Sequence, residues 1–166
     1  LKLFGRHYLT GELIPVDLVK KIKDSSNFLE GLATLRQLSF GFLDMAWHYS
    51  DCSAVTDVKA YENFAFEGTK IYPDVAENCM STAFSHIFQG GYSSGYYSYK
   101  WAEVLDADAF EAFKETGIFN KETARKFKTC ILSKGGTEKP MDLYVQFRGK
   151  EPGGDALLKR AGLLLS

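Results

Sequence analysis

Hydrophobic positions recur at three- and four-residue steps along most of the chain, the spacing typical of helices with one buried face. Pro15 stands where a first-turn proline would, ahead of the apolar positions Val16, Val19 and Ile22. After the cap candidates Ser25, Ser26 and Asn27 comes a longer apolar run, Phe28, Leu32, Leu35, Leu38, Phe42 and Ala46. Each run predicts a helix.

Capping residues and glycines mark the ends of the remaining predicted helices. These helices span residues 57–67, 92–115, 120–132, 140–147 and 155–161, and Gly68, Gly117, Gly135, Gly149 and Gly162 follow their ends. An alternating pattern occurs only at Tyr144–Phe147 and is too short to predict a strand. The sequence therefore predicts an all-α fold, an irregular multi-helix bundle of about six to eight helices.

The composition of the chain limits the kinds of partner that we expect. A chain of 166 residues with 45% hydrophobic and 25% charged residues suits one domain with its own core. The formal net charge of -1 leaves no electrostatic footprint for nucleic acid, so we expect no nucleic-acid partner. Apolar stretches stay well below the roughly 20 residues that cross a bilayer, so we expect no membrane-spanning segment.

The three cysteines form no CxxC pair, and their odd number makes a poor disulfide framework. Free thiols in a reducing compartment are the simpler interpretation. We therefore expect a cytoplasmic protein. A periplasmic or exported location stays open, because the chain begins at Leu1 and reads as the middle of a longer protein.

The most unusual stretch is residues 84–99, with one histidine, three glycines and four tyrosines in sixteen residues. At about 100° per residue, a helix would place Tyr92, Tyr96 and Tyr99 on one face. Such a face is either an aromatic packing stripe or a row of hydroxyl donors facing a cleft. Gly90-Gly91 and Gly95 disfavour a helix, a local conflict that is expected at functional sites. Alternatively, these glycines only form a turn and a close helix crossing.

Histidines give weaker signals. His86, considered by itself, has the pattern of an ordinary core or surface residue, and the same interpretation holds for His7 and His48. His48 lies at the end of an apolar helix, where a cation suits the helix dipole.

Taken together, these residues resemble a known family. His86, Gly90-Gly91-Tyr92, the run Tyr96–Tyr99 and Trp101-Ala102-Glu103-Val104 are similar to the C-terminal signature of the thimet oligopeptidase and bacterial peptidyl-dipeptidase family of zinc metallopeptidases. Phe84–Phe88 resembles the peptidyl-dipeptidase branch most closely. The resemblance covers nearly the whole chain. It implies that residues 1–166 are one helical region, the C-terminal part of a larger two-lobed helical peptidase.

Family members hold zinc with an HExxH helix and a further Glu, and they cleave short peptides. The histidines of this chain are His7, His48 and His86, so no pair has that spacing. The resemblance implies that zinc binds the full-length enzyme through a preceding segment. We therefore expect no metal ligand in this chain and no peptidase activity from it alone.

The resemblance also assigns roles to individual residues. The catalytic candidates are His86 and Tyr99, and the substrate-binding candidates are Tyr92, Tyr96, Gly90 and Gly91. As water attacks a peptide carbonyl, negative charge grows on its oxygen, and one donor aimed there contributes roughly 3 kcal/mol in comparable sites. Lys100 and the pair Ser93-Ser94 depart from the usual family pattern, which puts local packing in question.

Two alternatives follow from the same residues. The tyrosine face is also compatible with a non-enzymatic helical module that binds a peptide or protein in a groove. A chain cut from a larger protein would expose its former interface, so self-association of this piece is expected. The sequence leaves open whether the parent enzyme releases dipeptides or cleaves internally.

Overall fold

The computed structural model describes residues 3–164, and within this range it contains helices and turns but no strand. One isolated antiparallel bridge pairs Arg6 with Leu13. The all-α prediction is confirmed. The elements in chain order are α1 (Val16–Ser25), α2 (Glu30–Tyr49), α3 (Val58–Phe66), α4 (Met80–Ala83), the 3-10 turn η1 (Ser85–Ile87), α5 (Ser98–Thr116), α6 (Lys121–Phe127), the π-helical turn η2 (Lys128–Leu132), α7 (Pro140–Arg148) and α8 (Asp155–Arg160).

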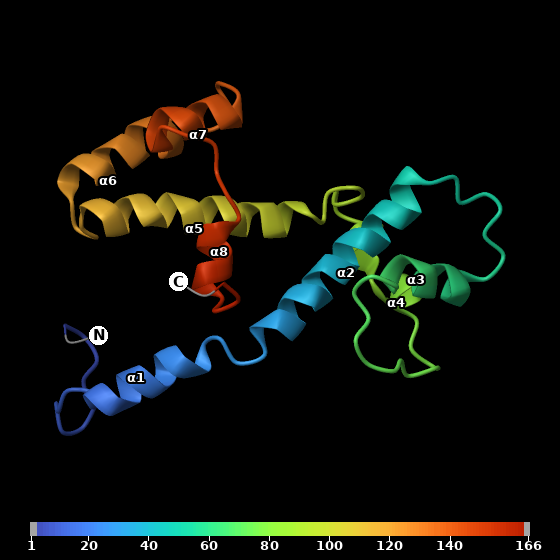
Figure 1. Cartoon of the computed structure of the whole chain (residues 1–166), viewed down its shortest axis with the longest axis horizontal. Coiled ribbons are helices and arrows are strands. Elements are labelled where there is room, and N and C mark those ends of the chain that lie inside the picture. The colour runs from blue at the N-terminus through green and yellow to red at the C-terminus, as the bar shows by residue number, and fades with distance from the viewer. Residues whose placement is uncertain (1–2, 165–166) are drawn as a thin grey trace.

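Two long helices organise the chain (Figure 1). Helix α2 has 20 residues and is therefore about 30 Å long. Helix α3 packs against α2, and α4 packs against α3. The chain then passes through a loop beside α2 into α5. Helix α6 and helix α7 return above α5, and α8 crosses it from the other side.

The apolar interior has two parts. Around α5, the buried residues are Ala109, Ala112, Tyr144 and Phe147, with Leu105, Phe113, Phe127, Cys130 and Ile131 packed against them. In the other part, Leu43 of α2 and Ile87 of η1 are fully buried. The ring of Phe40 lies 4.9 Å from the ring of Phe84 in this second part. Helix α2 therefore provides the platform on which residues 84–97 rest.

Several predicted helix boundaries are confirmed by their caps. Asp57 caps α3 by accepting a hydrogen bond from the backbone N–H of Ala60. Asn120 caps α6 by accepting from the N–H groups of Glu122 and Thr123. Gly149 ends α7 with a φ of 83°, the left-handed conformation that glycine adopts without strain.

Two predicted boundaries are wrong. Helix α2 begins at Glu30 after Leu29, which has a φ of 56° and offers no side-chain cap. The expected cap residues Ser25 and Ser26 instead donate their hydroxyls to the carbonyls of Ile22 and Lys23, at the end of α1. They therefore close the preceding helix and do not open the next one.

The helix predicted over residues 92–115 begins only at Ser98. Residues 92–97 form turns, because Gly91 and Ser94 have φ values of 81° and 57° and a right-handed helix requires negative φ. Tyr92 and Tyr96 therefore do not share a helix face with Tyr99, and the prediction that the three tyrosines lie on one face of a helix is wrong.

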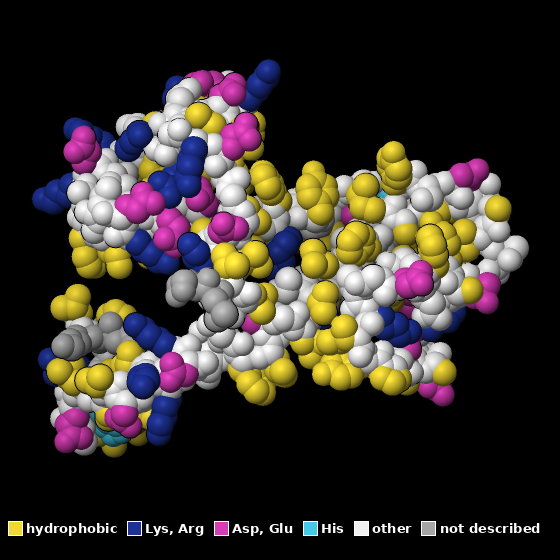
Figure 2. All heavy atoms as spheres, viewed as in Figure 1, with side chains coloured by type: hydrophobic (Ala, Val, Ile, Leu, Met, Phe, Trp, Pro, Cys, Tyr) yellow, Lys and Arg dark blue, Asp and Glu magenta, His cyan; other side chains and the backbone are white. Residues whose placement is uncertain are grey.

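Large apolar side chains lie uncovered over much of the surface (Figure 2). Leu3, Tyr8 and Phe119 are each more than 85% exposed, and α1 contains no buried residue at all. Such an extensive uncovered apolar surface is unusual for a monomeric protein. Among residues 3–164, every helix is too short or too polar to span a lipid bilayer.

Candidate functional site

A glycine-rich segment, residues 88–97, joins η1 to α5 through successive turns. Gly90 and Gly91 have φ values of 79° and 81°, a conformation that side chains with a Cβ adopt only with strain. Gly95 donates its N–H to the carbonyl of Tyr92 at 2.8 Å, and a Cβ at Gly95 would lie 3.3 Å from that same oxygen. The glycines thus serve turn formation, and the turns fold Tyr92 back toward α5.

Four predicted side chains meet in what we call the imidazole–phenol cluster: His86, Tyr92, Tyr96 and Tyr99. The ring of His86 lies 4.5 Å from that of Tyr92, and Tyr92 stacks on Tyr99 at 5.7 Å. Tyr96 lies 5.2 Å from Tyr99. The Nε2 atom of His86 lies 3.3 Å from the Tyr99 hydroxyl. The structure therefore brings together the residues that the sequence singled out, although by turns and not by one helix face.

The members of the cluster differ in accessibility. Tyr92 and Tyr99 are 36% and 42% exposed, and His86 is exposed as well. Tyr96 is half-buried and donates its hydroxyl to the side-chain oxygen of Gln37 on α2 at 3.0 Å. Its hydroxyl is thus engaged within the protein, whereas those of Tyr92 and Tyr99 lie at the surface.

An open groove of about 400 Å³ runs along the cluster between α2 and α5. Its lining comprises His86, Tyr96 and Tyr99 together with Glu30, Ala33, Gln37, Lys100 and Glu103. A smaller hollow of about 150 Å³ adjoins it and shares Tyr96, Tyr99 and Lys100. The cluster therefore faces an accessible groove and is not sealed within the interior.

The hydroxyls of Tyr96 and Tyr99 both keep their protons at neutral pH. Hydrogen bonding with the Tyr92 hydroxyl raises the pKa of Tyr99, and desolvation adds to this effect. Burial raises the pKa of Tyr96, against an opposing effect of the Arg36 charge. A phenol with a raised pKa keeps its proton, so Tyr99 is available as a hydrogen-bond donor over the whole neutral range.

Sequence reasoning missed Asp44. Its carboxylate is fully buried and accepts the backbone N–H groups of Ser94 at 2.8 Å and Tyr96 at 2.9 Å. His48 Nδ1 lies 2.8 Å from the same carboxylate. His48 therefore has a specific partner besides the helix dipole. The available signal was an Asp and a His four residues apart, which share a helix face.

Glu62 on α3 was also missed. It is 1% exposed and accepts both the N–H and the hydroxyl of Ser81, as well as a hydrogen bond from Lys59. Burial by itself would raise the pKa of Glu62, but the hydrogen bonds from Ser81 and Lys59 outweigh it and hold the pKa below its ordinary value. Trp47 of α2 donates to the same Ser81 hydroxyl, so Glu62 ties α4 to α3 and α2.

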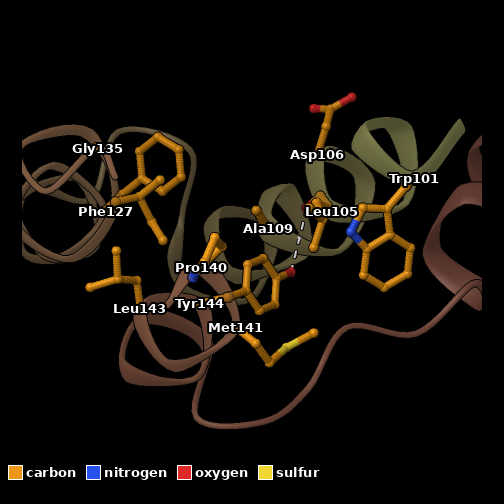
Figure 3. A pocket seen from close by; sticks show the side chains of 11 residues that line it. Trp101, Leu105, Asp106, Ala109, Phe127, Gly135, Pro140, Met141, Leu143 and Tyr144 are labelled. Carbon is orange, nitrogen blue, oxygen red and sulfur yellow. Dashed lines mark hydrogen bonds between the residues drawn. The ribbon is translucent and has the colours of Figure 1, made fainter. Parts of the chain in front are cut away.

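A second hollow, of about 270 Å³, lies between α5, η2 and α7 (Figure 3). Its wall is apolar and includes Trp101, Leu105, Phe127, Met141 and Tyr144. The Tyr144 hydroxyl already donates to Asp108 at 2.6 Å, and the carboxylate of Asp106 points away from the hollow. Trp101 contributes an indole N–H to this hollow, but the lining holds no imidazole and no free acid or base, so the groove beside the imidazole–phenol cluster is the candidate site.

Within residues 3–164, no group of three or more His, Cys, Asp or Glu side chains is placed to hold a metal ion. His48 and His86 lie against Asp44 and Tyr99 and not against each other. The described residues therefore do not fit a zinc site. That this chain binds no zinc stays a prediction.

Known proteins resemble this chain over almost its whole length. Residues 1–163 match the description "Peptidase family M3". Oligopeptidase A of Escherichia coli is 44% identical over 165 residues, which cover 98% of this chain and 24% of that protein. Dipeptidyl carboxypeptidase of Escherichia coli is 36% identical over 162 residues, covering 96% and 24%, and saccharolysin of Saccharomyces cerevisiae is 32% identical over 158 residues, covering 95% and 22%.

These similarities confirm the family that the cluster residues indicated. Over the whole chain the identity to oligopeptidase A exceeds that to dipeptidyl carboxypeptidase, whereas the local resemblance of Phe84–Phe88 favoured the peptidyl-dipeptidase branch. The chain spans about a quarter of the length of these relatives. With a match from residue 1 to residue 163 and relatives that are at least 32% identical over almost the whole chain, the chain belongs to peptidase family M3.

Proposed function

We propose that this chain is the C-terminal, substrate-facing part of a zinc-dependent oligopeptidase that hydrolyses short peptides. The observation that carries the proposal is the meeting of His86, Tyr92 and Tyr99 beside an open groove. Imidazole and phenol groups at a groove are suited to bind a peptide backbone and to donate hydrogen bonds to a carbonyl oxygen. The apolar hollow beside Tyr144 has no imidazole, and the Tyr144 phenol there already donates to Asp108.

His86 and Tyr99 are the proposed catalytic donors. Their mutual distance of 3.3 Å supports the proposal, because a single carbonyl oxygen that gains negative charge as the peptide bond is attacked could then lie near both groups. Tyr96 lines the same groove and Tyr92 stacks on Tyr99 beside it, so both are proposed to bind substrate. At Gly91 the position of a Cβ is open space, so a peptide backbone can approach the chain closely there. At Gly90 the same position lies 3.9 Å from the Tyr92 ring, so Gly90 is proposed to bind substrate together with that ring.

The remaining catalytic groups lie outside this chain in the proposal. Zinc and the general base would come from another part of the full-length protein, as the absence of an HExxH sequence in residues 1–166 requires. The chain by itself is then inactive. We also propose a cytoplasmic location. One plant relative carries the name "Probable cytosolic oligopeptidase A", while another from the same plant is named organellar.

The test compares the full-length protein with residues 1–166 alone on internally quenched peptides of about five to ten residues. We expect zinc-dependent cleavage by the full-length protein and none by the shorter chain, because only the former supplies the metal and the base. Mass spectrometry of the products then separates dipeptide release from internal cleavage. Peptide binding without cleavage by the full-length protein would refute the proposal and favour a non-enzymatic helical binding module.

A further inference from the structure

The tyrosine-bearing turns depend on a single buried carboxylate. We propose that Asp44 is a positioning residue for the imidazole–phenol cluster, and that it acts through the backbone N–H groups of Ser94 and Tyr96. The proposal concerns the shape of residues 92–97. Its consequence for activity rests on the proposed function.

The two carboxylate oxygens of Asp44 have different partners. Oδ1 accepts the N–H of Ser94 at 2.8 Å and lies 2.8 Å from His48 Nδ1, while Oδ2 accepts the N–H of Tyr96 at 2.9 Å. Asp44 is fully buried, so water does not substitute for any of these partners. A buried carboxylate is costly to the fold unless such donors surround it, and in return it fixes their positions.

The segment that Asp44 binds is strained at one of its backbone positions. Ser94 adopts a left-handed φ of 57°, which a non-glycine residue avoids unless its surroundings impose it. The N–H that Asp44 accepts belongs to this same residue. A second accepted N–H, two residues later, belongs to Tyr96, whose ring lies 5.2 Å from Tyr99. Asp44 thus fixes both the strained residue and the ring next to the catalytic phenol.

Few other hydrogen bonds hold the segment in place, although the Tyr96 ring also packs against Phe40 and Phe84. The Ser93 hydroxyl donates to the carbonyl of Ile87 at 2.7 Å, which ties the segment to η1. The Tyr96 hydroxyl reaches Gln37 of α2. Among the described residues, the backbone of 92–97 is otherwise bonded to its own turns and to the start of α5. Loss of the Asp44 acceptors would therefore free the turns, while α2 and α5 remain helical.

The test uses Asp44→Asn in the full-length protein. The substitution keeps the shape but replaces one acceptor oxygen with an NH₂ group, so at least one of the three partners loses its acceptor. We expect kcat/KM to fall by about ten- to a hundredfold, carried mainly by kcat, with zinc content unchanged. Combining Asp44→Asn with Tyr99→Phe should cost less than the product of the separate losses, because both changes disable the same donor.

Asp108→Asn is the matched control. Asp108 is also a buried carboxylate on a helix and accepts a hydrogen bond from Tyr144, but it lies nine residues beyond Tyr99, roughly 13 Å along α5. We expect it to lower stability comparably while changing kcat/KM less than about threefold. An equal loss of activity in Asp108→Asn, or multiplicative losses in the Asp44→Asn and Tyr99→Phe pair, would overturn the proposal.

Hydrogen exchange by mass spectrometry supplies a readout that needs no activity. In Asp44→Asn, peptides covering residues 92–97 should exchange about tenfold faster or more, while peptides from α7 stay unchanged. Unchanged exchange at 92–97 would overturn the proposal. If the wild-type protein cleaves no peptide, the proposed function fails, and the exchange result still decides whether Asp44 holds the segment.

Discussion

The Nε2 atom of His86 lies 3.3 Å from the hydroxyl of Tyr99. The two residues come from a 3-10 turn and from the first turn of α5, and the chain between them folds back through glycine turns. Their contact places an imidazole and a phenol at one edge of the groove. The variants of these and other residues are to be measured in the full-length protein, apart from the self-association of residues 1–166.

Removing the Tyr99 hydroxyl tests its role as a donor. We expect Tyr99→Phe to lower kcat by about a hundred- to a thousandfold, the loss typical of one oxyanion donor. The midpoint of thermal unfolding should change little, since the hydroxyl lies at the surface and the ring remains. Steady-state kinetics with one quenched peptide provide the measurement. Tyr97→Phe is the control, because Tyr97 is 59% exposed and outside the imidazole–phenol cluster; a wild-type kcat for Tyr99→Phe would refute the role.

Gly91 tests the turn that precedes the cluster. A Cβ at Gly91 meets open space, so Gly91→Ala costs only the left-handed backbone conformation, about 1 to 2 kcal/mol. The turn should relax, and kcat/KM should fall by about tenfold or more because Tyr92 follows directly. Gly136→Ala is matched, since its site is equally open and its φ is not positive. Equal kcat/KM values for the two variants would contradict this prediction.

From the burial of Tyr144 we predict how the free energy of unfolding changes at alkaline pH. Burial raises its pKa well above the ordinary value of 10, and the hydrogen bond to Asp108 adds to this effect. Above pH 10 the unfolded phenol releases its proton while the folded one retains it. Its contribution to the free energy of unfolding is therefore complete below that pH and declines as the pH rises.

Tyr144→Phe removes this contribution. The variant should lose about 1 kcal/mol at neutral pH, and its unfolding midpoint should fall less steeply than that of wild type between about pH 9 and pH 11. Thermal unfolding followed by circular dichroism measures both slopes. Tyr49→Phe, at an 83% exposed position, serves as the control and should follow wild type. Parallel slopes for wild type and Tyr144→Phe would show that Tyr144 does not titrate as expected.

The uncovered apolar surface predicts the behaviour of residues 1–166 alone. Phe119 and Leu3 are at least 90% exposed, and α1 buries no residue. We expect this chain to self-associate, because association removes apolar area from water. Sedimentation velocity across a hundredfold concentration range should show a rising sedimentation coefficient, whereas the full-length protein should sediment as one species. A concentration-independent monomer of residues 1–166 would contradict the prediction.

Helix content and most boundaries were predictable because they depend on local chemistry. Asp57, Asn120 and Gly149 act at helix ends within a few residues, and the structure confirms each of them. The start of α5 was not predictable from periodicity, because Tyr92 and Tyr96 have the right spacing for a helix face although they lie in turns. Two positive φ values before the helix, at Gly91 and Ser94, override that spacing.

The residues of the candidate site were predictable, but the hydrogen bonds that hold them in place were not. His86 and the tyrosines lie within fourteen residues of one another, so a dense local motif revealed them. Asp44 is fifty residues from Ser94 in sequence, and only the packed chain shows that they are bonded. Long-range backbone contacts of this kind leave no periodic or compositional signal in a single sequence.

The same separation has a consequence for the order of folding. Contacts between His86 and Tyr99 close a short stretch of chain, whereas the bonds from Ser94 and Tyr96 to Asp44 close 50 and 52 residues. Closing the longer stretch costs more entropy and is slower. During refolding, the rings should therefore meet early in loose contact, and a productive arrangement should arise only when the amides dock on the second helix.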